Sequence, residues 1–434
     1  MSPLAELLLA LGFEVSGSDR VCDVGRPPSH LAALERRGLS LVPQDGSGVT
    51  SAWSGVVVST AIEPGNPDLV AAGRMGVPVI HRARLLADLV RERTCVAVAG
   101  TAGKTTVTGM IGWILEQAGL DPTVFAGGAV LNWVRPDATG CVRVGRLGPW
   151  VIEVDESDRS FLDFQPEWAV ITNVSQDHFP LEEVERLFRQ FAGRVGRTVV
   201  GWMGRPSNEE LFEGLRPRFV RDGIRFGFRG REVRLAMLGI HNARNAVQAL
   251  ALAEQIGVKP TAAIRALAGF RGIARRLEIV GRAHGITVVD DYAHNPAKIR
   301  AGWETLASGH RRVLGVWRPH GFGPLALMAD DLEAVFVEIM RQDDVLFLLP
   351  VYYAGGTVVR VMTSDDLADR LVRRGLRVQA VADVSAVERA VLGQVSPGDA
   401  VLVMGARDPD LPVWARRLAD LLAQAGPAAR YKSS

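Results

Sequence analysis

Residues 96–106 read Val96-Ala-Val-Ala-Gly100-Thr-Ala-Gly-Lys104-Thr105-Thr106. An apolar run leads into a glycine-rich turn, and a helical pattern follows that opens on lysine and threonine. Glycines let backbone N–H groups close around phosphate oxygens, and a helix N-terminus adds its positive dipole end. The lysine can reach the outer phosphates, and the next hydroxyl can hold Mg²⁺. The stretch therefore predicts a phosphate cradle between a strand and a helix.

This cradle is shorter than the common P-loop pattern, which has a glycine five residues before the second one. Val98 occupies that position. The alternative is a glycine turn with an incidental lysine, and the register of Lys104 with two threonines argues against it. The candidate phosphate-binding residues are Gly100, Thr101, Gly103, Lys104, Thr105 and Thr106.

Composition places the chain among globular proteins. It has 434 residues, 47% hydrophobic content and a formal net charge of +2, so the charge gives no support for a nucleic-acid partner. Cys22, Cys95 and Cys141 lack paired or metal-ligand spacing, and a reducing cytoplasm is expected. The apolar run 7–11 lacks the flanks of a signal peptide. No stretch is long and apolar enough to predict membrane insertion.

Strand and helix patterns alternate and predict an α/β protein of three domains. Residues 1–92 are expected to form a Rossmann-like domain with a parallel sheet, residues 93–270 an ATP-binding domain with a parallel sheet around the cradle, and residues 271–434 a second Rossmann-like domain. The first domain begins with a helix, whereas such units begin with a strand and a glycine-rich turn. Helices are expected at 29–37, 67–74, 81–90, 328–341, 364–373 and 411–424, and strands at 39–42, 55–59, 77–80, 312–317, 345–350 and 400–404.

An acidic cluster follows the apolar strand 150–152. Glu153 comes first, and a carboxylate brought beside Thr105 would complete an oxygen site for Mg²⁺. Asp155, Glu156 and Asp158 follow. Clustered charges of this kind usually form a solvated turn. The position after a buried strand favours a functional interpretation for Glu153, and favours it less for the other three.

Further polar side chains follow the next apolar segments. His178 comes after a strand that leads into Thr172-Asn173, where it can ligate a metal or orient an acyl phosphate, or serve as a structural histidine. Asn242 and Asn245 open a helix and suit recognition of an adenine edge. Helix capping by Asn242 is the alternative.

A third group surrounds the strand that ends in Asp290-Asp291. The acidic pair is available for ribose hydroxyls, and His294 is available for phosphate or substrate. Arg275 and Arg276 precede the strand and can hold phosphate charge in a bidentate manner. Each of these signals is weak alone, and their order along the chain is specific.

The motifs resemble, in order, those of the Mur ligase family, the ATP-dependent peptide ligases of peptidoglycan synthesis. They are Gly100-Thr-Ala-Gly-Lys-Thr-Thr106, Glu153-Val-Asp-Glu-Ser-Asp158, Thr172-Asn-Val-Ser-Gln-Asp-His178, Gly239-Ile-His-Asn-Ala-Arg-Asn245 and Asp290-Asp-Tyr-Ala-His-Asn-Pro296. The resemblance covers nearly the whole chain. It is strongest to the branch that joins L-alanine to UDP-N-acetylmuramate and to the related branch that recycles murein tripeptide.

The resemblance implies a domain for a UDP-sugar, one for ATP and one for an amino acid. It also implies a reaction in which ATP phosphorylates the carboxylate of a UDP-N-acetylmuramate-type substrate and an amino acid or peptide attacks the acyl phosphate. Magnesium and lysine would offset the charge of the approaching anions. A monomer or homodimer is expected.

The resemblance also implies roles for individual residues. Lys104, His178 and His294 are the catalytic candidates. Thr105, Glu153 and His178 are the metal candidates. Asn242, Asn245, Arg276 and Asp291 join the cradle residues as ATP-binding candidates. Ser16, Ser18, Asp19, Ser59, Thr60 and His320 are the substrate-binding candidates.

The chain departs from the family pattern in two places that matter for substrates. The N-terminal glycine-rich loop is missing, and we expect either a start upstream of Met1 or a truncated domain. Gly321 and Pro324 replace arginines that would grip the incoming amino acid, and Arg318 can compensate. The alternatives are a murein peptide-recycling ligase, the same chemistry on another substrate, as in folate- and cyanophycin-type ligases, and a nucleotide-binding protein with lost or altered ligase activity.

Overall fold

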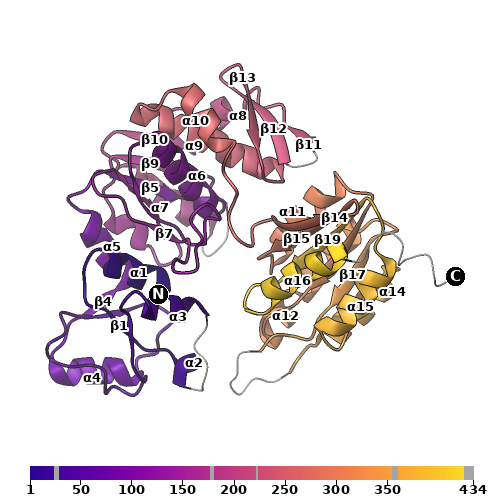
Figure 1. Cartoon of the computed structure of the whole chain (residues 1–434), viewed down its shortest axis with the longest axis horizontal. Coiled ribbons are helices and arrows are strands. Elements are labelled where there is room, and N and C mark those ends of the chain that lie inside the picture. Colours follow the sequence, from indigo (N-terminus) through magenta and orange to yellow (C-terminus); the bar gives the residue numbers. More distant parts are fainter. Residues whose placement is uncertain (24–28, 176–179, 221–222, 354–359, 425–434) are drawn as a thin grey trace. The chain divides into compact units, whose positions relative to one another are not determined.

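The computed structural model describes residues 1–23, 29–175, 180–220, 223–353 and 360–424 (Figure 1). Strands and helices alternate through it, which confirms the α/β class. Internal contacts divide the chain into two compact units. Unit 1 comprises Met1–Arg218, Ile224–Ala236 and His241–Ile273, and unit 2 comprises Phe219–Gly223, Met237–Ile240 and Ala274–Ser434. No helix in the described ranges is long and apolar enough to cross a membrane.

Unit 1 opens with an alternation that matches the expected helices and strands to within a few residues. Its elements are α1 (Ser2–Ala10), β1 (Ser16–Gly17), α2 (Arg20–Asp23), α3 (Ser29–Glu35), β2 (Ser40–Leu41), β3 (Val56–Val58), α4 (Pro67–Met75), β4 (Val79–His81) and α5 (Arg82–Val90). Asn66 caps α4 by accepting a hydrogen bond from the Asp68 N–H, and Gly76 ends it in the left-handed region.

The expectation of one parallel sheet in this segment is wrong. The strands form two separate parallel pairs, β1 with β2 and β3 with β4. In the doubly wound order 3-2-1-4 the first strand lies between the second and the fourth. The two pairs fit this order with β1 and β3 in the places of the second and fourth strands, and no strand in the described ranges pairs with their inner edges. A cavity of about 390 Å³ is lined by both pairs and by α1, including Leu4, Leu8, Val15, Val57 and Ile80.

The centre of unit 1 is a six-stranded sheet of order β10-β9-β5-β8-β6-β7. Its strands are β5 (Cys95–Ala99), β6 (Thr123–Phe125), β7 (Val142–Arg143), β8 (Trp150–Glu153), β9 (Trp168–Ile171) and β10 (Thr198–Gly201), and its helices include α6 (Lys104–Gln117), η1 (Ser160–Asp163), α7 (Leu181–Ala192) and α8 (Asn208–Phe212). All pairs are parallel except β6 with β7. Every residue of β5 is buried, which explains its continuous apolar sequence. The carboxyl ends of β5, β8 and β9 therefore meet at one edge of the sheet.

A small sheet of order β11-β12-β13 follows, which sequence patterns did not predict. It consists of β11 (Arg218–Val220), β12 (Gly223–Phe228) and β13 (Arg231–Leu235), and two helices come after it, α9 (Ile240–Ile256) and α10 (Pro260–Leu267). Strands β12 and β13 form an antiparallel hairpin. Most of α9 is buried, from Asn242 to Ala253.

Unit 2 holds a second six-stranded sheet, of order β14-β15-β19-β16-β17-β18. It is parallel apart from β14. Its strands are β14 (Glu278–Ala283), β15 (Ile286–Asp291), β16 (Arg312–Trp317), β17 (Val345–Leu348), β18 (Val378–Ala380) and β19 (Asp399–Met404), and its helices are α11 (Pro296–Ala307), α12 (Phe322–Leu327), α13 (Ala329–Ile339), α14 (Ser364–Arg373), α15 (Val384–Gln394) and α16 (Leu411–Gln424). The strands and helices expected here are confirmed.

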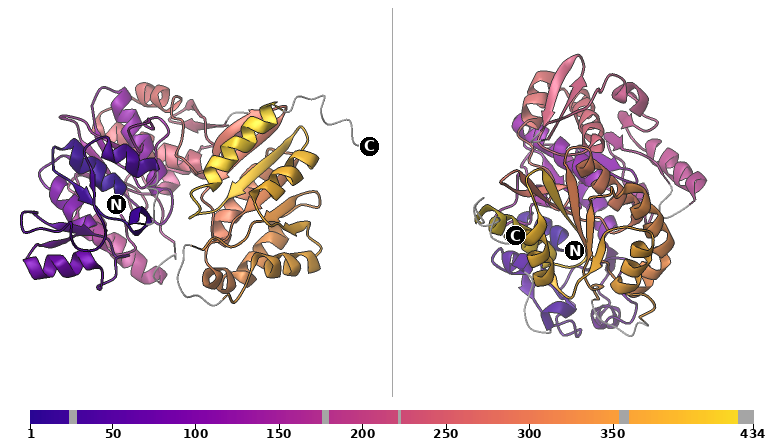
Figure 2. Two further views of the ribbon diagram at one scale, coloured as in Figure 1. Left: turned by 60° about the horizontal axis from the view of Figure 1, so that its bottom comes forward. Right: turned by 90° about the vertical axis from the view of Figure 1, so that its right-hand side faces the viewer.

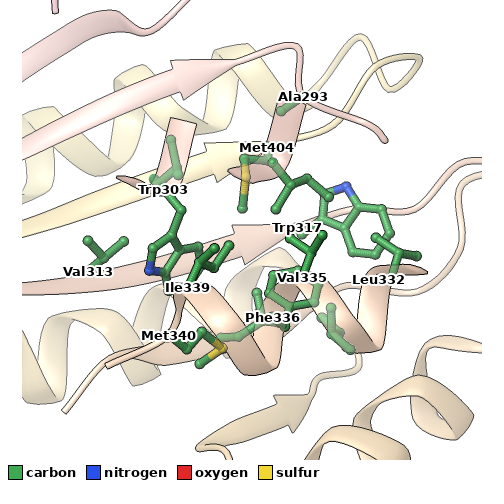
Figure 3. Close-up of a cluster of buried hydrophobic side chains, with 14 of the residues drawn as sticks. Ala293, Trp303, Val313, Trp317, Leu332, Val335, Phe336, Ile339, Met340 and Met404 are labelled. Carbon is green, nitrogen blue, oxygen red and sulfur yellow. The ribbon is translucent and has the colours of Figure 1, made fainter. Parts of the chain in front are cut away.

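Helices cover both faces of this second sheet (Figure 2). Residues of α11, α13 and α14 pack in one hydrophobic cluster, and residues of α15 and α16 pack in another. Trp303, Trp317 and Phe336 lie at the centre of the first cluster (Figure 3). The rings of Trp303 and Phe336 are 6.1 Å apart and almost perpendicular, an arrangement favoured by their quadrupoles.

The unpaired inner edges of β1 and β3 lead to a test. An apolar strand of about five residues, fused ahead of Met1 through a glycine turn, should pair with both edges and fill the cavity between them. We expect amide hydrogen exchange in β1 and β3 to slow by about tenfold or more. A glycine–serine extension of equal length is the matched control. Equal exchange rates with the two extensions would show that the slot does not accept a strand.

Candidate functional site

The predicted cradle is the connection between β5 and α6. Gly100 has φ +131° and Gly103 has φ +88°, backbone conformations that residues with a Cβ rarely adopt. Both glycines also lie against neighbouring groups. A Cβ on Gly100 would lie 2.0 Å from Thr172 Oγ1, and a Cβ on Gly103 would lie 2.6 Å from Asn245 Oδ1. The loop is therefore held in a shape that only glycine permits at these two positions.

Two polar residues after β9 fix the loop. Asn173 Oδ1 accepts hydrogen bonds from Thr101 Oγ1 at 2.6 Å and from the Ala102 N–H at 3.1 Å, and its Nδ2 donates to the Ala102 carbonyl at 2.8 Å. Thr172 Oγ1 donates to the same carbonyl at 2.6 Å. Both residues were expected at a strand end, with no role of their own. The signal was their position after a fully buried strand that pairs with β5.

Lys104 opens α6 and has two partners. Its Nζ donates to the Gly100 carbonyl at 2.7 Å and forms an ion pair with Glu156 Oε2 at 2.7 Å. The two charged side chains are 15% and 7% exposed, so the pair is largely shielded from water. The solvated-turn alternative is wrong for Glu156, a buried residue for which a functional role was expected less than for Glu153.

Thr105 and Glu153 meet as expected. Thr105 Oγ1 donates to Glu153 Oε1 at 3.0 Å, and Glu153 Oε2 accepts from the Gly127 N–H at 2.6 Å. Hydroxyl and carboxylate oxygens are donors that Mg²⁺ accepts, and the ion commonly keeps several waters beside one or two protein ligands. Among the described residues no three His, Cys, Asp or Glu side chains gather as a metal cluster. His178, the other metal and catalytic candidate, lies outside the described residues.

Asn245 of α9 lies beside the cradle, and Asn242 is bonded to it. Asn242 and Asn245 are 3% and 7% exposed, and Asn245 Nδ2 donates to Asn242 Oδ1 at 3.3 Å. Asn245 is also the neighbour of Gly103 described above. Asn242 is the third residue of α9 and so does not occupy the N-cap position of the capping alternative. Thr106, the remaining cradle candidate, is buried.

The substrate candidates of residues 1–92 fall into two groups. Ser16, Ser18 and Asp19 line the cavity between the two strand pairs. The Ser18 hydroxyl donates to Asp68, which holds it in place. Ser59 and Thr60 follow β3 and do not line this cavity.

A second group of candidates lies in unit 2 at the ends of β15 and β16. The Arg276 guanidinium lies 5.5 Å from the centre of the Tyr292 ring, and buried Asp291 accepts the Leu277 N–H at 2.8 Å. The His294 and His320 rings lie edge to face with centroids 5.4 Å apart.

The protonation state of His294 follows from its surroundings. Burial lowers the pKa of His294 to about 4, so the ring is neutral near pH 7. Its Nδ1 lies 2.9 Å from the Tyr292 carbonyl oxygen. A carbonyl can only accept, so Nδ1 carries the proton and Nε2 offers a lone pair. Burial, followed by the Arg407 charge, also lowers the pKa of His320.

The environment of Arg318 differs from the expectation that this side chain compensates for the missing arginines. Arg318 forms an ion pair with Asp408 and donates to the Pro350 carbonyl at 3.3 Å, so its charge already has a partner. The Arg360 guanidinium lies 5.5 Å from the centre of the Phe322 ring.

Comparison with known proteins matches these segments to one family in chain order. Residues 1–94 match "Mur ligase family, catalytic domain", residues 98–187 match "Mur ligase middle domain", and residues 275–407 match "Mur ligase, glutamate ligase domain". These matches bear out the three-domain architecture. The exact boundaries after residues 92 and 270 stay predictions.

Individual relatives cover nearly the whole chain. A UDP-N-acetylmuramate–L-alanine ligase of Myxococcus xanthus is 36% identical over 94% of this chain and 90% of its own length. One of Geobacter sulfurreducens is 35% identical over 94% and 92%.

Solved structures share the fold. UDP-N-acetylmuramate-alanine ligase MurC of Thermotoga maritima superposes with a TM-score of 0.77 at 24% identity, covering 98% of this chain and 96% of its own. A murein peptide ligase of Psychrobacter arcticus superposes with a TM-score of 0.64 at 23% identity, covering 98% and 96%. With the sequence relatives above, the matches show that the chain belongs to the Mur ligase family.

Proposed function

We propose that the protein is an ATP-dependent ligase that joins an amino acid, L-alanine or one like it, to the carboxylate of UDP-N-acetylmuramate, with release of ADP and phosphate. The names of the sequence relatives support the two substrates. The observation that carries the proposal is the convergence of Lys104, Thr105 and Glu153 at one sheet edge under a loop fixed by two glycines.

The role of the cradle follows from charge. A carboxylate oxygen attacks the γ-phosphorus of ATP while the bond to ADP breaks, so two anions must approach each other. Lys104, the N–H groups of the loop and the start of α6 offset this charge. Thr105 and Glu153 would hold Mg²⁺, which would add positive charge between the phosphates. Asn245, which lies beside Gly103, and its hydrogen-bond partner Asn242 are the proposed contacts to the nucleotide.

The second step needs a base. The amine nitrogen attacks the carbonyl carbon of the acyl phosphate, the C–O bond breaks, phosphate leaves, and the nitrogen must lose a proton. His294 supports this step because its Nε2 has a free lone pair at neutral pH. We also propose His178 for the metal and acyl phosphate, Arg276 and Asp291 for the nucleotide, and His320 for the substrate.

The remaining assignments concern substrates and location. Ser16, Ser18, Asp19, Ser59 and Thr60 are the proposed contacts to the UDP-sugar. Because Arg318 is paired with Asp408, the carboxylate of the amino acid would need another cation. A peptide-recycling ligase would use the same cradle. Activity with a murein peptide in place of an amino acid would identify it. The predicted cytoplasmic location and the monomer or homodimer stay predictions.

The close approach at the cradle predicts the effect of a single methyl group. Gly100→Ala would place its Cβ 2.0 Å from Thr172 Oγ1 and 3.0 Å from backbone atoms of residues 172 and 173. We expect the Kd for ATP, measured by calorimetry, to rise about tenfold or more as the loop shifts. Gly73→Ala, in open space on α4, should leave it unchanged, and Gly103→Ala serves if Gly100→Ala does not fold. Unchanged affinity in both cradle variants would contradict the assignment.

Phosphate release tests the reaction itself. With ATP, Mg²⁺ and UDP-N-acetylmuramate, release should depend on one member of a panel of amino acids and murein peptides. Lys104→Ala should lower kcat by about 100-fold or more, because it removes a positive charge that stabilises the transition state more than the bound substrates. Lys259→Ala, at the exposed start of α10, is the matched control. Release by Lys104→Ala at the control rate would refute the cradle, and no substrate-dependent release by the unmodified protein would refute the ligase.

A further inference from the structure

The loop Asp155–Asp158, between β8 and η1, has acidic side chains that face two different parts of unit 1. Glu156 reaches the cradle, where it forms the ion pair with Lys104 at 2.7 Å. Asp155 and Asp158 reach the start of α5. Asp155 Oδ2 lies 3.3 Å from Arg82 Nη2, and Asp158 Oδ2 lies 3.7 Å from His81 Nε2. One short loop therefore contacts both the phosphate cradle and the start of α5.

Local hydrogen bonds hold the backbone of this loop. Asp155 Oδ1 accepts the Ser157 N–H at 3.0 Å, and Asp158 Oδ1 accepts the Ser160 N–H at 3.0 Å. Arg159, which has φ +61°, donates its N–H to the Glu156 carbonyl at 3.0 Å. These bonds link Asp155, Glu156 and Asp158 to the backbone of the same turn.

Occupation of the cradle would leave Glu156 without its partner. Phosphate oxygens compete for the Lys104 ammonium, and Glu156 has only 7% of its side chain exposed. A largely buried carboxylate next to a polyphosphate is costly unless a cation compensates it. Arg159, which follows this loop, is engaged with Glu183 on α7. Arg82 is paired with the residue directly before Glu156.

Arg82 is a second cation beside this loop. It lies 3.3 Å from Asp155, the residue before Glu156, and the two side chains are each 40% exposed. Lys104 and Arg82 are thus paired with neighbouring carboxylates of one loop. When Lys104 turns to phosphate, Arg82 stays beside the loop.

We propose that Arg82 is a positioning residue of the phosphate cradle. Its guanidinium neutralises Glu156 when a bound nucleotide draws Lys104 away. Arg82 belongs to the first segment of the chain and does not contact the cradle in the ion pairs described above. Binding at the cradle and the contact of α5 with the acidic loop are then linked, and such linkage is reciprocal. The inference rests on the proposed binding of ATP by this cradle.

A double-mutant cycle tests the proposal. The Kd for Mg–ATP is measured by calorimetry for the unmodified protein, Arg82→Gln, Glu156→Gln and the double variant. Arg82→Gln should weaken binding about five- to tenfold, within the usual range of coupling between sites. Glu156→Gln should bind at least as tightly as the unmodified protein, since it removes a competitor for Lys104. In the Glu156→Gln background, Arg82→Gln should change nothing.

Controls separate positioning from general damage. Arg84→Gln removes the neighbouring arginine of α5, which pairs with Asp88 on the same helix, and should leave the Kd unchanged. Arg82→Lys should restore most of the affinity. An equal loss from Arg82→Gln with and without Glu156 would overturn the inference, as would no loss at all. No ATP binding by the unmodified protein would instead overturn the proposed function.

Discussion

The loop between β5 and α6 passes so close to the end of β9 that a single Cβ at Gly100 would meet the Thr172 hydroxyl at 2.0 Å. The remaining features of the cradle depend on this approach. The parallel pairing of β5 with β9 places Thr172 and Asn173 beside the loop. Their side chains form four hydrogen bonds with Thr101 and Ala102. The fixed loop then sets where α6 begins, and with it the positions of Lys104 and Thr105.

Charge balance is the second constraint on this region. Lys104 forms an ion pair with Glu156, and Thr105 donates a hydrogen bond to Glu153. Both carboxylates come from the end of β8, on the opposite side of β5 from β9. A buried charge left alone is expensive, so a ligand that binds Lys104 would leave Glu156 in need of another partner. This is the physical reason to look for a link between the cradle and α5.

The sequence was informative where structure is local and strongly patterned. The strand–loop–helix of the cradle and the expected strands and helices between residues 312 and 424 followed from periodicity and turn residues. The meeting of Thr105 with Glu153 followed from the position of Glu153 at the end of a buried strand. The Lys104–Glu156 pair could not be predicted, because Glu156 looks like any solvated acid until the loop geometry is known. Nor did the sequence predict the division of residues 1–92 into two strand pairs. The pattern of a single strand does not say which other strand it pairs with. That choice depends on whether a further strand lies between the two.

The proposed reaction activates a carboxylate by phosphorylation at this cradle before an amine attacks it. It can be tested directly with UDP-N-acetylmuramate labelled with ¹⁸O in its carboxylate. An acyl phosphate transfers one of its carboxylate oxygens to the phosphate that leaves. We therefore predict one ¹⁸O atom in each inorganic phosphate released during ligation, as seen by mass spectrometry. Phosphate free of ¹⁸O, released together with an amide product, would contradict the account.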